Sequence, residues 1–367
     1  MIVTIGGAVD HAKSRSQRAT ALVTHLLGDF SAEGVSNEEV LDFDISLFNL
    51  WKLKQNPYAS KSNTSLDSVC QQSSETRDLA NGSLLLDLTV NNNRDLLGLL
   101  QINELNSNIG LLFSTGPILK EMSESDLTEN MTKELLMGVT ITRSRAGVDE
   151  KIIIKPGAIS YVISSLTELS SREITGLLSI GKVPTSELMP PIFIETSSFA
   201  TNHTHIITTL QSTPCNLKSV ILCNILASFS NLNYIITLLE SCPCKICIDH
   251  FGNILQPIHS PILPHDDEII DTLYKLCEQG YLSRIILSIS IKFKIQLLQF
   301  GGPGYNHIEQ SIIPKLQRKG FSDDSITALV STNLIDVLAW YNPPPIIELP
   351  PETLQCNWCL TEFIPGN

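Results

Sequence analysis

Eight short apolar segments, separated by stretches with helical spacing, constrain the fold of this chain more than any other feature. They are rich in β-branched residues and nearly all lack strict apolar/polar alternation, which is typical of strands buried on both faces. The segments span residues 19–25, 83–88, 109–114, 158–163, 191–196, 219–225, 245–249 and 284–290. Helical spacing is clearest at residues 95–105, 166–178, 232–239 and 266–280. Alternating strands and helices in this number predict an α/β protein with a parallel (β/α)8 TIM barrel.

The chain has 367 residues, a length that a single barrel commonly occupies. We therefore expect one barrel over residues 1–340, with a large first βα loop at about 27–82 that acts as a lid on the barrel mouth. Residues 341–367 are rich in proline in their first part and should form an extended C-terminal tail.

The charge of the chain bears on its partners and its compartment. The net charge of -13 argues against nucleic acids and anionic membranes as partners, because both attract clusters of Lys and Arg. The sequence contains no apolar run of the ~18 residues that a membrane span needs, and its N-terminus lacks the order of a signal peptide. We expect a cytoplasmic protein and a small-molecule ligand, and the oligomeric state stays open.

The eighth strand leads into the glycine-rich sequence GGPGYNHI at 301–308, which is followed by a segment of helical spacing. This loop resembles the last barrel unit of the phosphotriesterase-related proteins, which belong to the amidohydrolase superfamily. Further similarities occur in the same order along the chain, and they include Asn56-Pro57-Tyr58, Asp87-Leu88-Thr89, Phe251-Gly252 and Asn333. The resemblance extends from about Val3 to Trp340 and implies a TIM barrel of the metal-dependent hydrolase type.

The resemblance also implies a catalytic site with two zinc ions per chain. Such a site activates a bound water and uses a His-x-His pair on the first strand, a bridging Glu or carboxylated Lys on the fourth, one His each on the fifth and sixth, and an Asp on the eighth. In this chain His25 keeps the second histidine of the pair, but Val23 replaces the first. The residues at the other positions are Ser160 and Tyr161, Glu195, Asn224 and Ser290.

Only His25 and Glu195 could still bind a metal at these positions. Zinc sites in proteins use at least three ligands from Cys, His, Asp and Glu, and serine or asparagine side chains bind zinc weakly. We therefore expect zinc to be absent or weakly bound, and we interpret the chain as a degenerate barrel, a pseudoenzyme. Two alternatives stay open: a metal-dependent hydrolase of ester, amide or phosphoester bonds with a reduced metal site, and a non-catalytic interaction scaffold.

The predicted pocket lies where the strands end. It contains polar side chains from six positions, namely His25, Tyr161, Glu195, Asn224, His250 and Ser290. Asp249, at the end of the seventh strand, is the candidate general base of the hydrolase alternative.

Other histidines and cysteines carry weaker signals. His203 and His205 repeat the His-x-His spacing, but they follow the fifth strand, where we expect them to begin a helix at the surface. Two cysteine clusters, at 242–247 and 356–359, have spacings that could form parts of a zinc site, although free thiols are the simpler interpretation.

Overall fold

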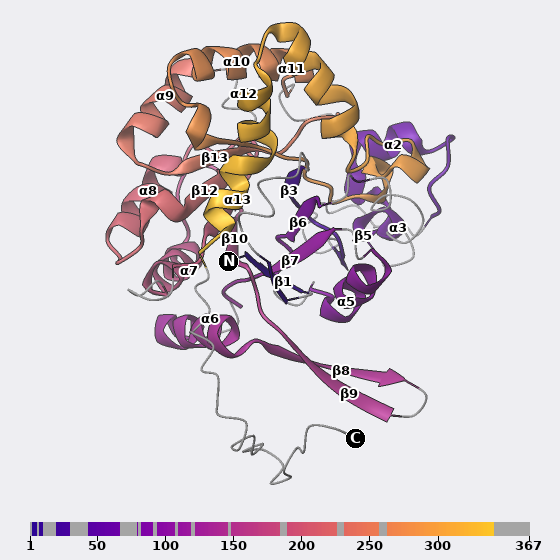
Figure 1. The fold of residues 1–367 in the computed structure, drawn as a ribbon, viewed down its shortest axis with the longest axis vertical. Coiled ribbons are helices and arrows are strands. Elements are labelled where there is room, and N and C mark those ends of the chain that lie inside the picture. The colour runs from indigo at the N-terminus through magenta and orange to yellow at the C-terminus, as the bar shows by residue number, and fades with distance from the viewer. Residues whose placement is uncertain are drawn as a thin grey trace, which may run out of the picture.

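The computed structural model contains the predicted parallel barrel (Figure 1). It describes residues 2–5, 7–9, 20–29, 43–66, 79, 82–90, 94–106, 109–118, 122–145, 148–183, 189–225, 231–256 and 263–340. All ladders of its eight-stranded sheet are parallel, and the order is β14-β13-β12-β11-β10-β7-β6-β3. The strands are β3 (Ala21–Thr24), β6 (Leu84–Asp87), β7 (Gly110–Thr115), β10 (Ala158–Ile163), β11 (Ile192–Thr196), β12 (Val220–Cys223), β13 (Lys245–Ile248) and β14 (Ile285–Leu287).

Helices follow most strands and form the outer layer, so that the alternation read from the sequence is confirmed. They are α5 (Leu96–Leu105), α6 (Glu124–Met137), α7 (Ser171–Lys182), α8 (His203–Gln211), α9 (Leu232–Ser241), α10 (Asp266–Glu278), α11 (Ile313–Lys319), α12 (Asp323–Thr327) and α13 (Asn333–Leu338). Two π-helical turns, Ile308–Ile312 and Ala328–Thr332, precede α11 and α13. The alternating faces of the strands divide the apolar core into a large cluster under the helices and a smaller one inside the barrel.

The first and last strands are joined by a side chain. Ser288, just after β14, donates its hydroxyl to the carbonyl of Val23 at 2.7 Å and accepts the Val23 amide at 2.6 Å. Ile291 donates its amide to the hydroxyl of Thr24 at 3.3 Å. A serine therefore occupies the position of a ladder contact and closes the barrel between β14 and β3.

The amino end of the barrel is covered by apolar residues from both ends of the described chain. Ile2 belongs to the interior cluster together with Leu334, Ile335 and Leu338 of the C-terminal helices. Ile2 lies in the short hairpin of β1 (Ile2–Thr4) and β2 (Gly7–Val9), which the sequence analysis did not predict. The opposite end, where the strands finish, is the one left for a functional site.

Two segments depart from the simple βα pattern. The antiparallel hairpin of β8 (Val139–Arg145) and β9 (Val148–Ile154) projects away from the barrel, and the sequence analysis missed it (Figure 1). The described parts of the first βα loop contain β4 (Gly28–Asp29), α2 (Leu50–Gln55), the short helices Pro57–Ala59 and Lys61–Thr64, and β5 (Ser65–Leu66). This loop contacts the segment after β14, where the Ile295 amide donates to Asn63 Oδ1 at 3.0 Å.

Some expectations fall outside the described residues. They include the C-terminal tail at 341–367 and the two stretches of the first loop at 30–42 and 67–78. Among the described helices, none combines the length and apolar character required to cross a bilayer.

Candidate functional site at the carboxyl ends of the strands

A buried contact between a histidine and a carboxylate lies at the barrel mouth. His25, directly after β3, places its Nε2 atom 3.0 Å from Oε2 of Glu195 on β11, and both side chains are almost fully buried. The other ring nitrogen of His25, Nδ1, lies 3.1 Å from the hydroxyl of Thr89. The structure thus brings together the two residues that the sequence analysis named as metal candidates, and it joins them directly.

Lys292 adds a positively charged group beside Glu195. Its ammonium nitrogen lies 3.5 Å from Glu195 Oε2. Burial by itself would raise the pKa of Glu195, but the charges and hydrogen bonds of His25 and Lys292 outweigh it and hold the pKa at about 2. Glu195 is therefore ionised at neutral pH, and its other oxygen, Oε1, is buried without a hydrogen-bond partner.

A second polar group is formed by the loops after β12 and β13. Oδ1 of Asp249 accepts the amide of Asn224 at 3.1 Å and lies 2.9 Å from Nδ1 of His250. Asn224 has a positive φ of 60° and uses both ends of its amide, since Nδ2 donates to the Thr196 carbonyl and Oδ1 accepts the Ser198 hydroxyl, each at 2.6 Å. Asn224 therefore ties the ends of two strands together and is not free to ligate an ion.

The fourth strand contributes less to the mouth than expected. Ser160 faces the barrel interior, fully buried, and its hydroxyl has no hydrogen-bond partner. Tyr161 points the other way, against α7, where its hydroxyl donates to the Arg172 carbonyl at 3.4 Å and its ring contacts Gly176. The placement of Tyr161 in the pocket was wrong, because neighbouring residues of a strand face opposite sides of the sheet.

Ser290 lies at the mouth after β14. Its amide donates to the carbonyl of Asp249 at 2.5 Å, and its carbonyl accepts the side chain of Gln296 at 3.3 Å. The backbone of Ser290 thus helps to fix the loop that carries Lys292.

Asp87 is the last residue of β6 and lies near enough to His25 for the two charges to interact. Burial raises the pKa of its carboxyl from 3.8 to about 6, although the charge of His25 and hydrogen bonds from Thr89 and Leu26 oppose the rise. One oxygen, Oδ2, has no hydrogen-bond partner. Asp87 is therefore the mouth carboxyl whose charge changes closest to neutral pH among those with a resolved shift.

These contacts allow a test of the binuclear zinc site that the resemblance implies. Val23 has no donor atom, Asn224 is used by two hydrogen bonds, and Ser160 offers only a neutral hydroxyl. His25 and Glu195 satisfy each other, and Lys292 already supplies positive charge where a metal would have to sit. The described residues at these positions therefore do not fit a two-metal site.

Two other predictions about histidines and cysteines can be compared with the structure. His203 does begin a helix, α8, but it is buried, with Nδ1 2.7 Å from the Tyr234 hydroxyl and Nε2 3.2 Å from the Thr196 hydroxyl. The expectation of a surface position was therefore wrong for His203, whose burial lowers its pKa to about 4. The described cysteines are free thiols, whereas Cys356 and Cys359 lie outside the described residues.

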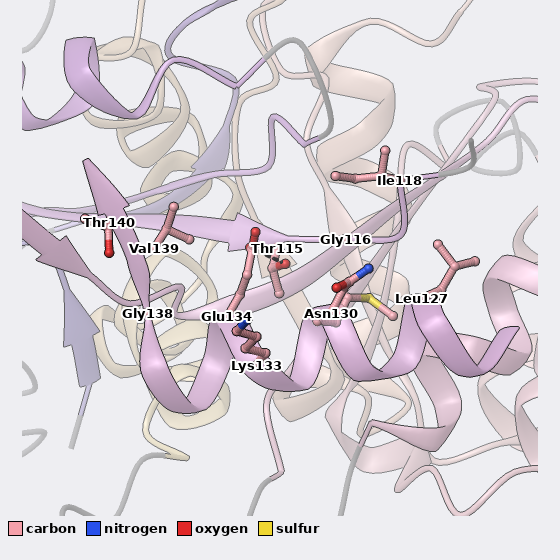
Figure 2. Close-up of a pocket in the computed structure, with 11 residues that line it drawn as sticks. Thr115, Gly116, Ile118, Leu127, Asn130, Lys133, Glu134, Gly138, Val139 and Thr140 are labelled. Atoms are coloured by element: carbon pink, nitrogen blue, oxygen red, sulfur yellow. Dashed lines mark hydrogen bonds between the residues drawn. The ribbon is translucent and has the colours of Figure 1, made fainter. Parts of the chain in front are cut away.

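A cavity of about 410 Å³ lies outside the barrel mouth, between β7, α6 and the start of β8 (Figure 2). Glu134 of α6 stands in its wall, where it accepts the Thr115 hydroxyl at 2.7 Å and pairs with Arg94 at 3.0 Å. The other lining residues are mainly apolar or neutral, and they include Ile118, Leu127, Asn130, Met131 and Val139. This cavity is separate from the residues at which the sequence predicted chemistry.

Three residues that shape the mouth or its floor were not predicted from the sequence, namely Lys292, Thr89 and Cys223. The sequence did contain a signal for Lys292. Ser288, Ser290 and Lys292 are spaced two residues apart, and residues with this spacing face the same side of a strand. No comparable local signal marks Cys223. Cys247 belongs to the cysteine cluster at 242–247, but its proximity to Cys223 of the neighbouring strand arises only when the barrel forms.

Comparison with known proteins agrees with this architecture. The sequence profile described as the Phosphotriesterase family matches residues 11–337. Among similar proteins, an N-acetyltaurine hydrolase of Xenopus tropicalis is 26% identical over 310 residues, which cover 80% of this chain and 84% of that protein. A phosphotriesterase-related protein of Nematostella vectensis is 22% identical over 306 residues, which cover 79% of this chain and 83% of that protein.

Solved structures resemble the fold over nearly the whole chain. A resiniferatoxin-binding protein from Rhodobacter sphaeroides superposes with a TM-score of 0.79 at 22% identity, covering 92% of this chain and 94% of that one. A lactonase from Listeria monocytogenes gives a TM-score of 0.70 at 15% identity, covering 93% and 99%.

Proposed function

This chain belongs to the phosphotriesterase family, and we propose that it is a degenerate member that binds a small molecule at the barrel mouth without binuclear-zinc hydrolysis. The observation that carries the proposal is the contact between His25 and Glu195. These are the two remaining candidate metal ligands, and they bind each other. Val23, Asn224 and Ser290 occupy other positions at which the resemblance implies ligands, and none offers a strong zinc donor.

The electrostatics of the mouth support this proposal. A buried carboxylate is stable only when it is paired, and Glu195 obtains its positive partners from Lys292 and His25. A metal ion bound at Oε2 of Glu195 would have to displace both groups and would place Lys292 beside a like charge. The same groups are suited to an anionic or strongly polar small molecule, which would meet an ammonium and imidazoles at the mouth.

A second candidate function has a specific observation in its favour. Several similar proteins, from Xenopus tropicalis, Dictyostelium discoideum and Salmo salar, are named N-acetyltaurine hydrolase. Under this alternative the chain hydrolyses an amide, ester or phosphoester with a reduced metal site that uses His25 and Glu195. Asp249 would then act as general base, with His250 beside its Oδ1.

A hydrolysis assay separates the two. The full chain, purified without chelators and offered zinc or manganese, is incubated with N-acetyltaurine, a lactone and a phosphotriester. We expect no turnover above buffer, and we expect N-acetyltaurine to raise the melting temperature if it is the bound class of molecule. The Xenopus tropicalis relative serves as the positive control for the amide assay.

The proposal would be contradicted if the unaltered chain showed turnover and His25→Ala lowered it at least about tenfold. The matched variant His205→Ala, at an exposed position, should leave that turnover unchanged. A tenfold loss corresponds to about 1.4 kcal/mol of transition-state stabilisation. Such a result would establish the reduced-site hydrolase instead.

A further inference from the structure

Three acidic or thiol side chains form a row across adjacent strands inside the barrel. Glu195 of β11 is directly opposite Cys223 of β12 in the parallel ladder. The next ladder pairs Leu222 with Ile246, so that one further step places Cys223 beside Cys247 of β13. Opposed residues of parallel strands face the same side, and both cysteines belong to the interior cluster.

Asp249 completes the group from just above this row. It lies two residues after Cys247, and the ligand atoms of Cys223, Cys247 and Asp249 all lie within 4.8 Å of one another. The three side chains are buried, with 0%, 0% and 4% of their surfaces exposed. The thiols are not joined in a disulfide.

Glu195 is a further buried carboxylate next to this group, opposite Cys223 in the ladder. Its Oε1 atom is buried and has no hydrogen-bond partner, while its Oε2 atom is satisfied by His25 and Lys292. The charges of both Glu195 and Asp249 act on both thiols, which places the two carboxylates around the cysteine pair. A buried carboxylate oxygen without a partner costs folding free energy unless a cation or donor satisfies it.

The geometry points to a soft divalent metal site, of the zinc class, formed by Cys223, Cys247 and Asp249, with the carboxylate of Glu195 nearby. Two thiolates and one carboxylate are donors that zinc accepts, and three protein ligands leave a fourth position for a water or another small ligand. Zinc–sulfur bonds of about 2.3 Å place two sulfurs roughly 3.8 Å apart in a tetrahedron, so that small side-chain movements suffice to close the cluster.

This site is distinct from the binuclear site that the mouth residues fail to fit. Its two cysteines occupy the interior layer below the mouth, and neither stands at a position where the resemblance implies a ligand. The metal would join the carboxyl ends of the neighbouring strands β12 and β13 from inside the barrel. The inference thus goes beyond the proposed function and is compatible with a barrel that does not hydrolyse.

Cobalt is the most informative probe, because its spectrum reports the ligands. The full chain, purified under reducing conditions without chelators, is titrated with Co²⁺ and in parallel with Zn²⁺ followed by elemental analysis. We expect close to one metal per chain, with a sulfur-to-cobalt charge-transfer absorption in the near ultraviolet and tetrahedral bands in the visible. Zinc should abolish both sets of bands by displacing cobalt.

Variants assign the ligands. Cys223→Ala should roughly halve the charge-transfer absorption, since one thiolate remains, and Cys223→Ala with Cys247→Ala should remove it. Asp249→Asn should weaken binding at least about tenfold while the thiolate absorption is retained at saturation. Cys277→Ala, at a half-buried free cysteine of α10, is the matched control and should change neither stoichiometry nor spectrum.

Several results would overturn the inference. Cobalt that binds without a thiolate band, a chain that stays metal-free, or a Cys223–Cys247 disulfide in freshly reduced protein would each do so, and none of these needs a folded variant. The hydrolysis assay is read separately. Thiolate-bound metal with turnover refutes the proposed function alone, whereas a metal-free chain without turnover refutes the metal site alone.

Discussion

Single residues at the mouth differ in charge because their partners differ. Glu195 and Asp87 are both buried carboxyls near His25, yet the pKa of Glu195 is held at about 2 and that of Asp87 is raised to about 6. Glu195 has Lys292 and His25 within reach of one oxygen. Asp87 accepts the amides of Thr89 and Leu26 on Oδ1, and burial prevails over these hydrogen bonds, the Thr89 hydroxyl and the charge of His25.

The raised pKa of Asp87 predicts a specific pH dependence of stability. The folded state retains a proton up to about pH 6, while the unfolded chain loses it near 3.8, so that the contribution of Asp87 to stability falls as the pH rises through this window. The full change corresponds to about 3 kcal/mol. We expect Asp87→Asn to gain about this much relative to the unaltered protein between pH 4 and pH 7.

Urea unfolding at a series of pH values measures this effect. Asp44→Asn, at an exposed position of the first loop, is the control and should follow the unaltered protein at every pH. If the free energies of unfolding of Asp87→Asn and of the unaltered protein changed in parallel with pH, the pKa of Asp87 would be the same in the folded and unfolded states.

At the scale of elements, the loops at the barrel mouth are fixed by side chains that cap the helices. Glu173, in the first turn of α7, accepts the amides of Ser164, Ser165 and Ser170 at 2.8 to 2.9 Å. It also accepts the hydroxyls of Ser165 and Ser170, at 2.5 and 2.7 Å. One carboxylate thus holds the end of β10, the following loop and the start of α7 together.

Removal of this carboxylate should destabilise the fold. We expect Glu173→Ala to lower the free energy of unfolding by on the order of 3 kcal/mol, because three backbone amides and two hydroxyls lose a charged acceptor. Although burial opposes it, hydrogen bonding lowers the pKa of Glu173 to about 2, so that its contribution should be present above about pH 4.5 and be lost as the pH falls towards 2. Glu168→Ala, at an exposed position of the same loop, should change stability by less than about 0.5 kcal/mol in the same denaturant titration.

For the whole molecule, the closure of the barrel depends on Ser288. Its hydroxyl replaces the ladder between β14 and β3 by bonding both the amide and the carbonyl of Val23. We expect Ser288→Ala to cost about 2 kcal/mol of stability, since it leaves two buried backbone groups unsatisfied. It should also increase the hydrogen-exchange rate of the Val23 amide far more than that of amides in β11.

Ser114→Ala is the matched control for this prediction. Ser114 is equally buried and donates to the Asp87 carbonyl at 3.0 Å, but it does not join the first strand to the last. Equal protection of the Val23 amide in both variants would mean that the barrel closes without Ser288.

The sequence by itself determined the eight strands, most of the helices and the family resemblance. These follow from local patterns: strands such as Val220–Cys223 are continuously apolar, and helices such as Asp266–Glu278 carry their own terminal signals. The hairpin Val139–Ile154 was missed because its strands are largely exposed and polar, so that burial left no pattern to read. Mouth residues such as His25 and Glu195 could be predicted because each of them lies at the end of a predicted strand.

Only the tertiary structure decided how those residues interact. Tyr161 faces α7 and not the barrel interior because alternate residues of a strand face opposite sides. The local sequence does not determine which set of alternate residues faces inward. The pairing of His25 with Glu195, and the meeting of Cys223 and Cys247, join residues that are distant in sequence and become neighbours only when the strands align. Local patterns record burial and period, whereas contacts between strands depend on register, and register is a property of the closed barrel.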